Sequence, residues 1–536
     1  MGALYVILFC CLSGHIVLFR GVALGSRILY VTAGGIGSHY PSSVGISKAL
    51  VRRGHHVTVA IDQGSYDKGE DGRYFPPNMD IIPFQRSLSL ATSLRCIDKY
   101  VRSALRGCSP NDVIDELPPP DYPGQDDHTF SDLNEGFCND ILNNTELIAK
   151  LSASNYDMII GDSVFLCYVL LSQKLSVPFI HFGLTSMVPS QHDIFAGNPV
   201  SPAYVPERAS ELTDQLTFRQ RFKNTLMYHL VRYFYNKLVL QTFEIVQQRH
   251  SLRPDVTFQQ LIAEAEMWIF SSNFLVDFAR PLPPHVRFVG GVLTGPPSQL
   301  NKELDVFANS SGEAGLVVVT MGTLITSQLT EQQSQAMATS LSLLPQKVVW
   351  AFSGRAPSAV GNNTLIVARI PQNDLLAHPK VRAFVSHGGL NSLHESVYHG
   401  VPVVCVPVFG DQGDNCVRLR TRGMAVKVDI KNLMDTTLYE AITEIIQNQR
   451  YKDTAVIMSQ IAKDRVSGMS PVDETAYWIE YAIKHGTQHL KPRALQLSFI
   501  EYFMLDVLAI NVVIVIAIIV GIKYTCCSRK VEVAGQ

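Results

Sequence analysis

The sequence has few charged residues and almost no net charge. Lysine, arginine, aspartate and glutamate together make up 17% of its 536 residues, and the formal net charge is −2. Without a basic surplus there is no electrostatic reason to expect a nucleic-acid partner. Cysteines nowhere form a C-x-x-C pair or a Cys/His ligand spacing, so we expect no bound metal. What the sequence does have is 46% hydrophobic residues in a chain too long for one ordinary domain, which predicts two domains with additional segments.

The two ends of the chain carry apolar runs. Residues 1–25 predict a signal peptide, with small residues at its end in the spacing of a cleavage site; a retained anchor or an N-terminal core strand is the alternative. Residues 503–522 are about one bilayer in length and predict a transmembrane helix. The short tail, residues 523–536, contains basic residues that are typical of the cytosolic side. We therefore expect a type I membrane protein with nearly all of its mass in a secretory lumen.

Two further patterns agree with a lumenal body without proving it. Disulfides are expected in an oxidising lumen, but the sequence does not pair Cys96, Cys108 and Cys138. Glycosylation sequons begin at Asn143, Asn309 and Asn362. Because such sequons occur often by chance, they support the lumenal location only weakly.

The first half begins with a β-α-β pattern. Strands are predicted at 27–31 and 57–61, with a helix at 44–53 between them, which is typical of a doubly wound α/β fold. The Gly-rich loop after the first strand does not match G-x-G-x-x-G, so no dinucleotide is expected there. His39 follows this loop, at the edge of the sheet where α/β proteins bind ligands.

A second polar residue is expected at the same edge. The run 156–162 predicts a buried strand that ends in Asp162, followed by a helix at 164–175. A lone histidine is most often structural, and Asp162 alone could cap the helix. Together, His39 and Asp162 form a stronger candidate for catalysis than either residue alone.

Several other segments are less specific. Residues 80–135 are predicted to be irregular, with a Pro-rich loop that suits a lid or a substrate wall. Residues 216–246 predict a long helix rich in aromatic and basic residues, which suits a hydrophobic substrate cavity, the membrane surface or ordinary packing. Residues 281–299 are predicted to link the two domains. An amphipathic helix at 473–483 is expected to pack back on the first domain.

The second half repeats the α/β pattern and ends in a ligand-binding motif. Strands are predicted at 316–321 and 348–352, with a helix at 330–343 between them. The run 381–386 then predicts a buried strand that ends at His387, turns through two glycines and opens a helix at 391–398. Free N–H groups and the helix dipole make such a turn an anion site.

The same stretch continues to a second polar edge. Glu395 lies one helical turn after Asn391, so both side chains can face one ligand. Another strand is predicted at 401–408, and Asp411 and Gln412 follow it at the mouth of the sheet. Residues 369–412 therefore predict a pocket for a phosphate that carries a hydroxyl-rich group.

This stretch resembles the signature of the UDP-glycosyltransferase family. The matching motifs are Pro371-Gln372-Asn373-Asp374-Leu375-Leu376, Ser386-His387-Gly388-Gly389, Glu395, His399-Gly400-Val401-Pro402 and Asp411-Gln412. The resemblance covers nearly the whole chain. It implies a GT-B architecture, in which two facing Rossmann-like domains precede a C-terminal transmembrane helix. The acceptor domain would span residues 26–285 and the UDP-sugar domain residues 286–490.

The resemblance also assigns roles to single residues. His39 matches the family's catalytic base and Asp162 its acidic partner. The residues that match the UDP-sugar site are Thr323, Arg369, Gln372, His387, Gly389, Asn391, Ser392, Glu395, Asp411 and Gln412. Arg369 departs from the pattern, because the family has a base-stacking Trp there. A guanidinium plane can also stack on a nucleobase.

Together these matches imply an inverting transfer of a hexosyl group, glucuronosyl or glucosyl, from a UDP-sugar to a hydroxyl of a small lipophilic acceptor. Histidine suits the base, because its reference pKa lies near neutral pH and a carboxylate can fix its tautomer. The UDP-sugar is a co-substrate, and no cofactor is expected. Other expected features are residence in the endoplasmic reticulum membrane and contact with the bilayer, while a homo-oligomer is left open. Two alternatives remain: a sphingolipid glycosyltransferase, and a catalytically silent lipophile-binding membrane protein.

Overall fold

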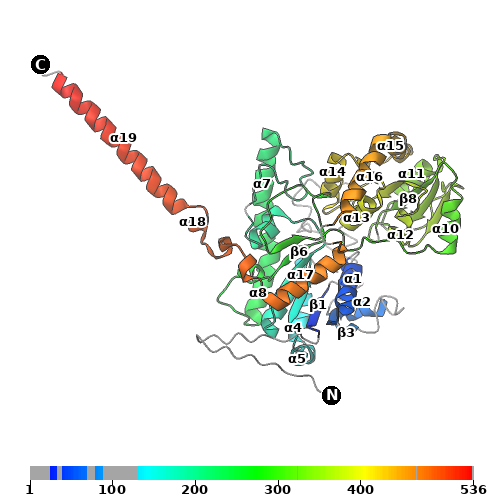
Figure 1. Ribbon diagram of the computed structural model, residues 1–536, viewed down its shortest axis with the longest axis horizontal. Coiled ribbons are helices and arrows are strands. Elements are labelled where there is room, and N and C mark those ends of the chain that lie inside the picture. The colour runs from blue at the N-terminus through cyan, green and yellow to red at the C-terminus, as the bar shows by residue number, and fades with distance from the viewer. Residues whose placement is uncertain are drawn as a thin grey trace.

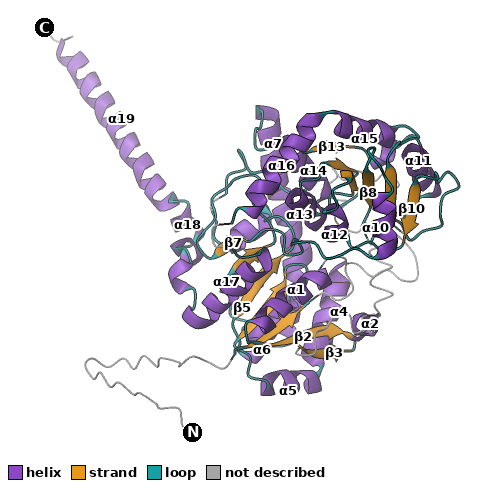
Figure 2. Cartoon of the chain, turned by 45° about the vertical axis from the view of Figure 1, so that its right-hand side comes forward, coloured by secondary structure: helices purple, strands orange, loops and turns teal. Residues whose placement is uncertain are grey.

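Two parallel β-sheets, each covered by helices, form the framework of the protein (Figure 1 and Figure 2). The computed structural model describes residues 25–32, 39–68, 79–87, 130–198, 200–322, 324–326, 328–465 and 468–533. The predicted signal peptide up to residue 24, the Pro-rich loop, Cys96, Cys108 and Thr323 lie outside these residues.

The first sheet has the strand order β3-β2-β1-β4-β5-β6-β7, and all of its neighbouring strands pair in parallel. Its strands are β1 (Arg27–Val31), β2 (His56–Asp62), β3 (Met79–Phe84), β4 (Met158–Asp162), β5 (Phe179–Gly183), β6 (Trp268–Phe270) and β7 (Val286–Phe288). The central strands are buried on both faces, which explains their near-continuous apolar sequences. The strand order reverses between β1 and β4, and ligands bind at such a point in open α/β sheets.

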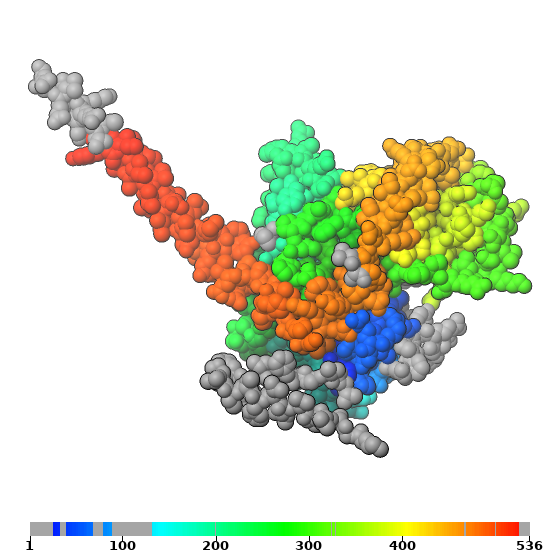
Figure 3. Space-filling model, in the orientation of Figure 1, coloured from blue at the N-terminus to red at the C-terminus, as the bar shows by residue number. Residues whose placement is uncertain are grey.

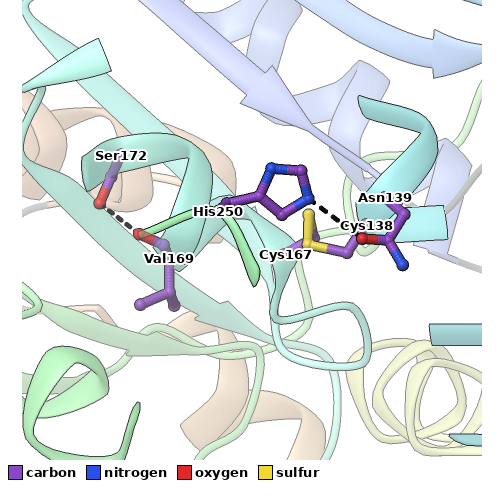
Figure 4. The surroundings of a disulfide bond; sticks show 6 residues. All are labelled: Cys138, Asn139, Cys167, Val169, Ser172 and His250. Carbon is purple, nitrogen blue, oxygen red and sulfur yellow. Dashed lines mark hydrogen bonds between the residues drawn. A yellow bond between two sulfur atoms is a disulfide. The ribbon is translucent and has the colours of Figure 1, made fainter. Parts of the chain in front are cut away.

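Helices cover both faces of this sheet. They are α1 (His39–Arg52), α2 (Gln63–Lys68), α4 (Phe130–Asn143), α5 (Thr145–Ala153), α6 (Cys167–Leu175), α7 (Phe218–Tyr235), α8 (Gln241–Arg249) and α9 (Phe258–Ala263). Two π-helical turns, η1 (Pro189–Asp193) and η2 (Asn236–Leu240), complete the set. A disulfide joins Cys138 on α4 to Cys167 on α6 (Figure 4). Cys138, one of the three cysteines singled out in the sequence, is thus paired with a cysteine outside that group.

The structure departs from the sequence expectation in residues 80–135. The described parts of this region are regular: β3 occupies its beginning and α4 its end. Pro83 cannot donate to a strand ladder. Since β3 is an edge strand of the sheet, Pro83 is tolerated there.

The helix predicted at 216–246 is divided by η2 into α7 and α8. A capping box between Thr217 and Gln220 begins α7. Its buried side chains lie on one side, while a row of large apolar side chains with helical spacing is exposed to solvent. This row, the α7 stripe, consists of Phe218, Phe222, Leu226, Leu230 and Tyr233. An ordinary packing helix buries such a row, but these five side chains are 38–74% exposed.

The second sheet has the order β10-β9-β8-β11-β12-β13, again with parallel neighbours. Its strands are β8 (Leu316–Thr320), β9 (Lys347–Ala351), β10 (Thr364–Val367), β11 (Val381–Ser386), β12 (Val403–Cys405) and β13 (Ala425–Lys427). The strand order reverses between β8 and β11. The strand expected at 401–408 is limited to β12, because Pro402 and Pro407 flank it.

The helices of this half pack on both faces of the second sheet. They are α10 (Lys302–Asn309), α11 (Glu331–Ser342), α12 (Gln372–Leu376), α13 (Leu390–His399), α14 (Gln412–Thr421), α15 (Thr437–Gln447) and α16 (Gln449–Lys463), with a short 3-10 turn η3 (Ile430–Asn432).

The chain then returns to the first domain through α17 (Pro471–His485), as expected for the amphipathic helix at 473–483. Its Glu480 accepts hydrogen bonds from Arg53 at the end of α1, at 2.8 and 2.6 Å, and bonds His55 at 2.9 Å. Figure 3 shows α17 lying across α1. Strand β7 belongs to the first sheet, and α17 packs its Ala476, Ile479 and Ala482 into a hydrophobic core of that sheet. Both elements therefore lie with the first domain.

After two 3-10 turns, η4 (Gln488–Leu490) and η5 (Arg493–Gln496), the chain enters α18 (Phe499–Tyr502) and α19 (Leu505–Val533). The segment Leu505–Tyr524 of α19 has a mean hydropathy of 2.9, and none of it is buried. This helix projects away from the body (Figure 1). It is long and apolar enough to cross a bilayer and is a candidate membrane span.

Candidate active site

His39 and Asp162 meet at the switch point of the first sheet. His39 is the first residue of α1, and Asp162 is the last residue of β4, which pairs with β1. The Nδ1 of His39 lies 2.7 Å from Oδ2 of Asp162. The other carboxylate oxygen of Asp162 accepts the N–H of Val164 at 3.0 Å, while α6 begins later, at Cys167. Asp162 therefore orients the imidazole and does not cap α6.

This contact fixes the protonation pattern of the ring. When Nδ1–H donates to the carboxylate, Nε2 keeps its lone pair and can accept a proton. Burial lowers the pKa of His39, but the charge and hydrogen bond of Asp162, together with the charge of Asp411, outweigh burial and raise it. The side chain of His39 is 15% exposed, so a substrate can reach it.

The turn after β11 presents free backbone N–H groups. Gly388 has φ of +87°, a left-handed conformation that glycine adopts readily. Gly389 is the N-cap residue of α13 and provides no side-chain cap. The first N–H groups of α13 are therefore available to an anion at the positive end of the helix dipole. Of the predicted residues, Asn391 and Ser392 lie in this first turn.

His387 lies between two glycines at this turn. A Cβ on Gly322 would lie 2.7 Å from Cε1 of His387, and one on Gly389 would lie 2.6 Å from Nε2. Only glycine leaves room for the ring at both positions. Burial lowers the pKa of His387 to about 4, against the opposing effects of Asp411 and a backbone hydrogen bond to Thr320. The ring is thus neutral at pH 7 and has a single N–H, which must turn from the Thr320 carbonyl to an oxyanion in order to donate there.

A second polar cluster joins α12 to α13. The amide Nε2 of Gln372 donates to Oγ of Ser392 at 3.0 Å and also to the carboxyl group of Glu395. Burial raises the pKa of Glu395 to about 8, although the Gln372 bond opposes it. Oδ1 of Asn391 is buried and makes no hydrogen bond with the described residues. An acid, an amide and a hydroxyl on adjacent helix faces suit a ligand with several hydroxyl groups.

Asp411 and Gln412 begin α14. Oε1 of Gln412 accepts the N–H groups of Val408 and Phe409, at 2.9 and 3.1 Å, which leaves its amide hydrogens for a ligand. Asp411 is acceptor-only when ionised. The two residues thus offer a donor and an acceptor side by side, as hydroxyl recognition requires.

Arg369 stands at the same edge, two residues beyond β10, and is exposed. Of the ten residues predicted to bind the UDP-sugar, nine are therefore described. Eight of these lie at the carboxyl edge of the second sheet or at the start of α12, α13 or α14, and Glu395 lies in the second turn of α13. Thr323 is the exception, since it is not described, although the structure describes Gly322 beside it. Within the described ranges, no three His, Cys, Asp or Glu side chains are grouped as metal ligands.

Sequence reasoning missed Asn415. It lies one helical turn after Asp411, and its Nδ2 donates to Oδ2 of Asp411 at 2.8 Å. No helix is predicted after Asp411, so the i, i+4 spacing that places both side chains on one face of α14 gave no signal.

The comparisons with known proteins agree with this geometry. Solved glycosyltransferases share the fold: a glycotransferase of kitacinnamycin has a TM-score of 0.56 at 15% identity, covering 85% of this chain and 98% of its own. A UDP-glucose: anthocyanidin 3-O-glucosyltransferase in complex with UDP has a TM-score of 0.58 at 17% identity, covering 86% and 99%. Two doubly wound parallel sheets and these neighbours define the fold as GT-B.

The sequence comparisons give the family. The family described as UDP-glucoronosyl and UDP-glucosyl transferase matches residues 27–535. Similar proteins include UDP-glucuronosyltransferase 2B33 of Macaca mulatta, 34% identical over 91% of this chain and 90% of the relative. A human 2-hydroxyacylsphingosine 1-beta-galactosyltransferase is also 34% identical, over 91% and 85%. The chain belongs to this family and is a UDP-glycosyltransferase.

Proposed function

We propose that this enzyme transfers a glucuronosyl or glucosyl group from a UDP-sugar to a hydroxyl group of a small lipophilic acceptor, with inversion at the anomeric carbon. The observation that carries the proposal is the 2.7 Å contact between His39 and Asp162 at the switch point of the first sheet. An alcohol or phenol is a poor nucleophile until a base takes its proton. His39 has a free Nε2 for this proton, and Asp162 stabilises the resulting imidazolium.

The electron balance of the step is simple. The acceptor O–H bond breaks and its proton goes to Nε2 of His39. The acceptor oxygen forms the new bond to the anomeric carbon, and the bond from that carbon to the diphosphate oxygen breaks. UDP leaves with the electron pair, and the N-terminus of α13 and the neutral His387 stabilise its charge.

The donor sites follow from the same geometry. Gln372 and Glu395 suit the base and ribose, Asn391 and Ser392 the diphosphate, and Asp411 with Gln412 the sugar hydroxyls. Thr323 is proposed as a further phosphate contact, and Arg369 as the group that stacks on uracil.

The donor sugar and acceptor are the least constrained parts of the proposal. Relatives named as glucuronosyltransferases support glucuronate as the donor sugar. The galactosyltransferase relative supports the second candidate, a sphingolipid glycosyltransferase, because its printed name contains an acylsphingosine. The third candidate, a silent lipophile-binding protein, would not need the His39–Asp162 contact.

Membranes that contain the full chain test these candidates directly. We would measure UDP release with UDP-glucuronate, UDP-glucose and UDP-galactose, each against a panel of phenols and against ceramide. Transfer to phenols that is lost in His39→Ala, with UDP binding retained, supports the proposal. Preferential transfer to ceramide favours the sphingolipid enzyme. UDP binding without turnover of any donor would contradict both enzymatic proposals, transfer to phenols and transfer to ceramide.

We further propose a type I topology in the endoplasmic reticulum, with a cleaved signal peptide, a glycosylated lumenal body and a cytosolic tail. The Cys138–Cys167 disulfide supports it, because disulfides form and persist in an oxidising secretory compartment. The side chains of Asn143, Asn309 and Asn362 are exposed, as glycosylation requires. Removal of N-glycans with an endoglycosidase should increase gel mobility. A full-length chain that never changes mobility, and whose tail is protected from protease in sealed microsomes, contradicts this topology.

A further inference from the structure

A chain of polar and charged side chains connects the donor edge of the second sheet to the interior of the first domain. It begins at Asp411, the residue proposed to hold the sugar hydroxyls, and it consists of Asp411, Asn415, Arg418, Asp277, Arg280 and Asp193. All except Asp411 are buried. The mechanism above uses only the first member.

Asp411 is the N-cap residue of α14, and Asn415 and Arg418 lie on that helix. Asn415 donates its Nδ2 to Oδ2 of Asp411 at 2.8 Å and accepts Nη1 of Arg418 on its Oδ1 at 2.9 Å. The spacing of four and then three residues places the three side chains on one face of the helix. The orientation of the Asp411 carboxylate therefore depends on Asn415, and that of Asn415 on Arg418.

The side chain of Arg418 contacts the first domain. Its Nε forms an ion pair with Oδ1 of Asp277 at 3.3 Å, and its Nη1 also donates to Oγ of Ser186 at 3.1 Å. Asp277 lies between β6 and β7 of the first sheet, and Ser186 follows β5. A single guanidinium thus bridges α14 and two loops of the acceptor domain.

The network continues inside the first domain. Oδ2 of Asp277 pairs with Nη2 of Arg280 at 3.0 Å, and Nη1 of Arg280 pairs with Oδ2 of Asp193 at 3.0 Å. Burial would raise the pKa of Asp277, but Arg418 and Arg280 outweigh it and hold the pKa below its ordinary value. Asp277 is therefore charged at neutral pH. Buried ion pairs are a poor source of stability because desolvation is costly, so a positional role explains this network better.

A second contact holds the same helix. One turn before Arg418, the carboxylate of Asp414 accepts the N–H groups of Ala209 and Glu211, at 2.6 and 2.8 Å. Both donors have left-handed backbones, with φ of 59° and 51°. A non-glycine residue occupies this region at a cost that its surroundings must offset. The acceptor domain thus holds α14 at two successive turns.

We propose that Arg418 and Asp277 are positioning residues for sugar transfer, which fix α14 and the Asp411 carboxylate relative to His39. This inference rests on the proposed function, because it assigns Asp411 to the donor sugar and His39 to the base. The two reacting groups come from different domains, so their distance is set by contacts between domains and not by either sheet alone. Misplacement by about 1 Å can cost about a hundredfold in rate.

The variant Arg418→Met tests the proposal. The network reaches the proposed UDP site only through the 3.1 Å hydrogen bond from Asn415 to the carbonyl of Gly388 in the α13 turn, so the dissociation constant of UDP should change much less than kcat. The kcat for sugar transfer should fall by about tenfold to a hundredfold, since the lost interaction acts in the transition state. Asp277→Asn should give the same pattern. Because both residues act in one network, the double variant should cost little more than either single variant.

Two further variants separate positioning from mere loss of packing. Arg418→Lys keeps the charge, but one ammonium group cannot reach Asp277, Ser186 and Asn415 in the fork geometry of arginine, so we expect a kcat reduced by about fivefold or more. Arg420→Gln changes an exposed arginine on the same helix and should leave kcat unchanged.

The outcomes distinguish this inference from the proposed function. Absence of turnover by the unmodified protein with every donor overturns both. Turnover by the unmodified protein, with kcat in Arg418→Met, Arg418→Lys and Asp277→Asn matching that of Arg420→Gln, overturns the positioning role alone. Lower melting temperatures with unchanged kcat lead to the same conclusion. If Arg418→Met does not accumulate in membranes, Arg418→Lys and Asp277→Asn decide the question.

Discussion

Asp411, at the start of α14, acts on His39, at the start of α1, although the two residues belong to different sheets. The charge of Asp411 raises the pKa of His39, in the same direction as the larger effect of Asp162. The proposed donor and acceptor halves are thus electrostatically connected in the structure. A sugar held by Asp411 would lie close to the base that activates the acceptor.

The pH dependence of sugar transfer should show the effect of Asp162 and Asp411 on the pKa of His39. His39 must be neutral to accept a proton, and its pKa is raised from the ordinary value of 6.5. The rate should therefore increase with pH through an apparent pKa above 6.5. Removing a negative charge destabilises the imidazolium. Asp162→Asn and Asp411→Asn should therefore both move the rising part of the pH–rate profile to lower pH, with the larger shift for Asp162→Asn. The plateau should also fall in Asp162→Asn, because the tautomer is no longer fixed. If the rising part of the profile lies at the same pH in both variants as in the unmodified protein, His39 is not the base that accepts the proton.

Binding of UDP should release protons through Glu395. Its pKa is raised to about 8, so the carboxyl group is largely protonated at pH 7 before UDP binds. Ribose hydroxyls that donate to the carboxylate favour its ionised form and lower its pKa. UDP affinity should therefore increase as pH rises from 6 toward 8.

Calorimetry in buffers of different ionisation enthalpy measures this proton release. Because UDP itself titrates near pH 6, the matched control is Glu395→Gln, which keeps a hydrogen-bonding side chain but cannot ionise. The difference in released protons between the two proteins isolates Glu395. If both proteins release the same number of protons when UDP binds, those protons do not come from Glu395.

The two candidate catalytic residues could be predicted from sequence because they lie at strand ends. The strand predicted at 381–386 coincides with β11, and that at 27–31 with β1. In a parallel sheet, the carboxyl ends of strands share one edge, so residues that follow β1 and β4 come together. The start of α1 was predicted five residues late. Pro41 lies in the first turn of α1, where proline is tolerated.

The ion pair between Arg418 and Asp277 could not be predicted in the same way. The two residues are far apart in sequence, and neither lies in a repeating pattern or at a strand end. Their contact depends on how two domains pack, which periodicity within one element does not encode. Residues that the topology brings to the edge of one sheet can thus be found from the sequence. Contacts between the two domains, which fix the position of one sheet edge relative to the other, cannot.

The disulfide between Cys138 and Cys167 should stabilise the first domain. It closes a loop with a sequence separation of 29 residues, which limits the conformations of the unfolded chain. Replacing both cysteines with alanine should lower the free energy of unfolding by about 2–4 kcal/mol. Thermal unfolding with and without a reducing agent checks this: reduction should destabilise the unmodified protein and leave the variant unaffected. If the variant unfolds at the same temperature as the oxidised protein, the bond contributes nothing to stability.

The α7 stripe should lie against the lipid surface. Phe218, Phe222 and Leu226 are 74%, 67% and 51% exposed, and Tyr502, just before α19, acts on the pKa of Tyr228 on α7. The stripe is therefore close to the start of the candidate membrane span, where an apolar helix face can enter the headgroup region. A fluorophore attached at Phe222→Cys in lipid nanodiscs should be shielded from iodide. The same label at Arg221→Cys, outside the stripe, is the control. Equal quenching at both positions would contradict lipid contact.

Arg369 provides a test of how uracil is held. If its guanidinium stacks on the base, Arg369→Ala should weaken UDP binding severalfold, and Arg369→Trp should restore or exceed the original affinity, because an indole offers a larger π surface. Arg369→Lys separates stacking from simple attraction to the diphosphate, since it keeps the charge and loses the plane. Stacking predicts that the lysine variant resembles alanine and that its affinity depends little on salt. Attraction predicts that lysine resembles arginine and that binding weakens as ionic strength rises. Titration of UDP into the four proteins at two salt concentrations therefore decides which property of the residue matters.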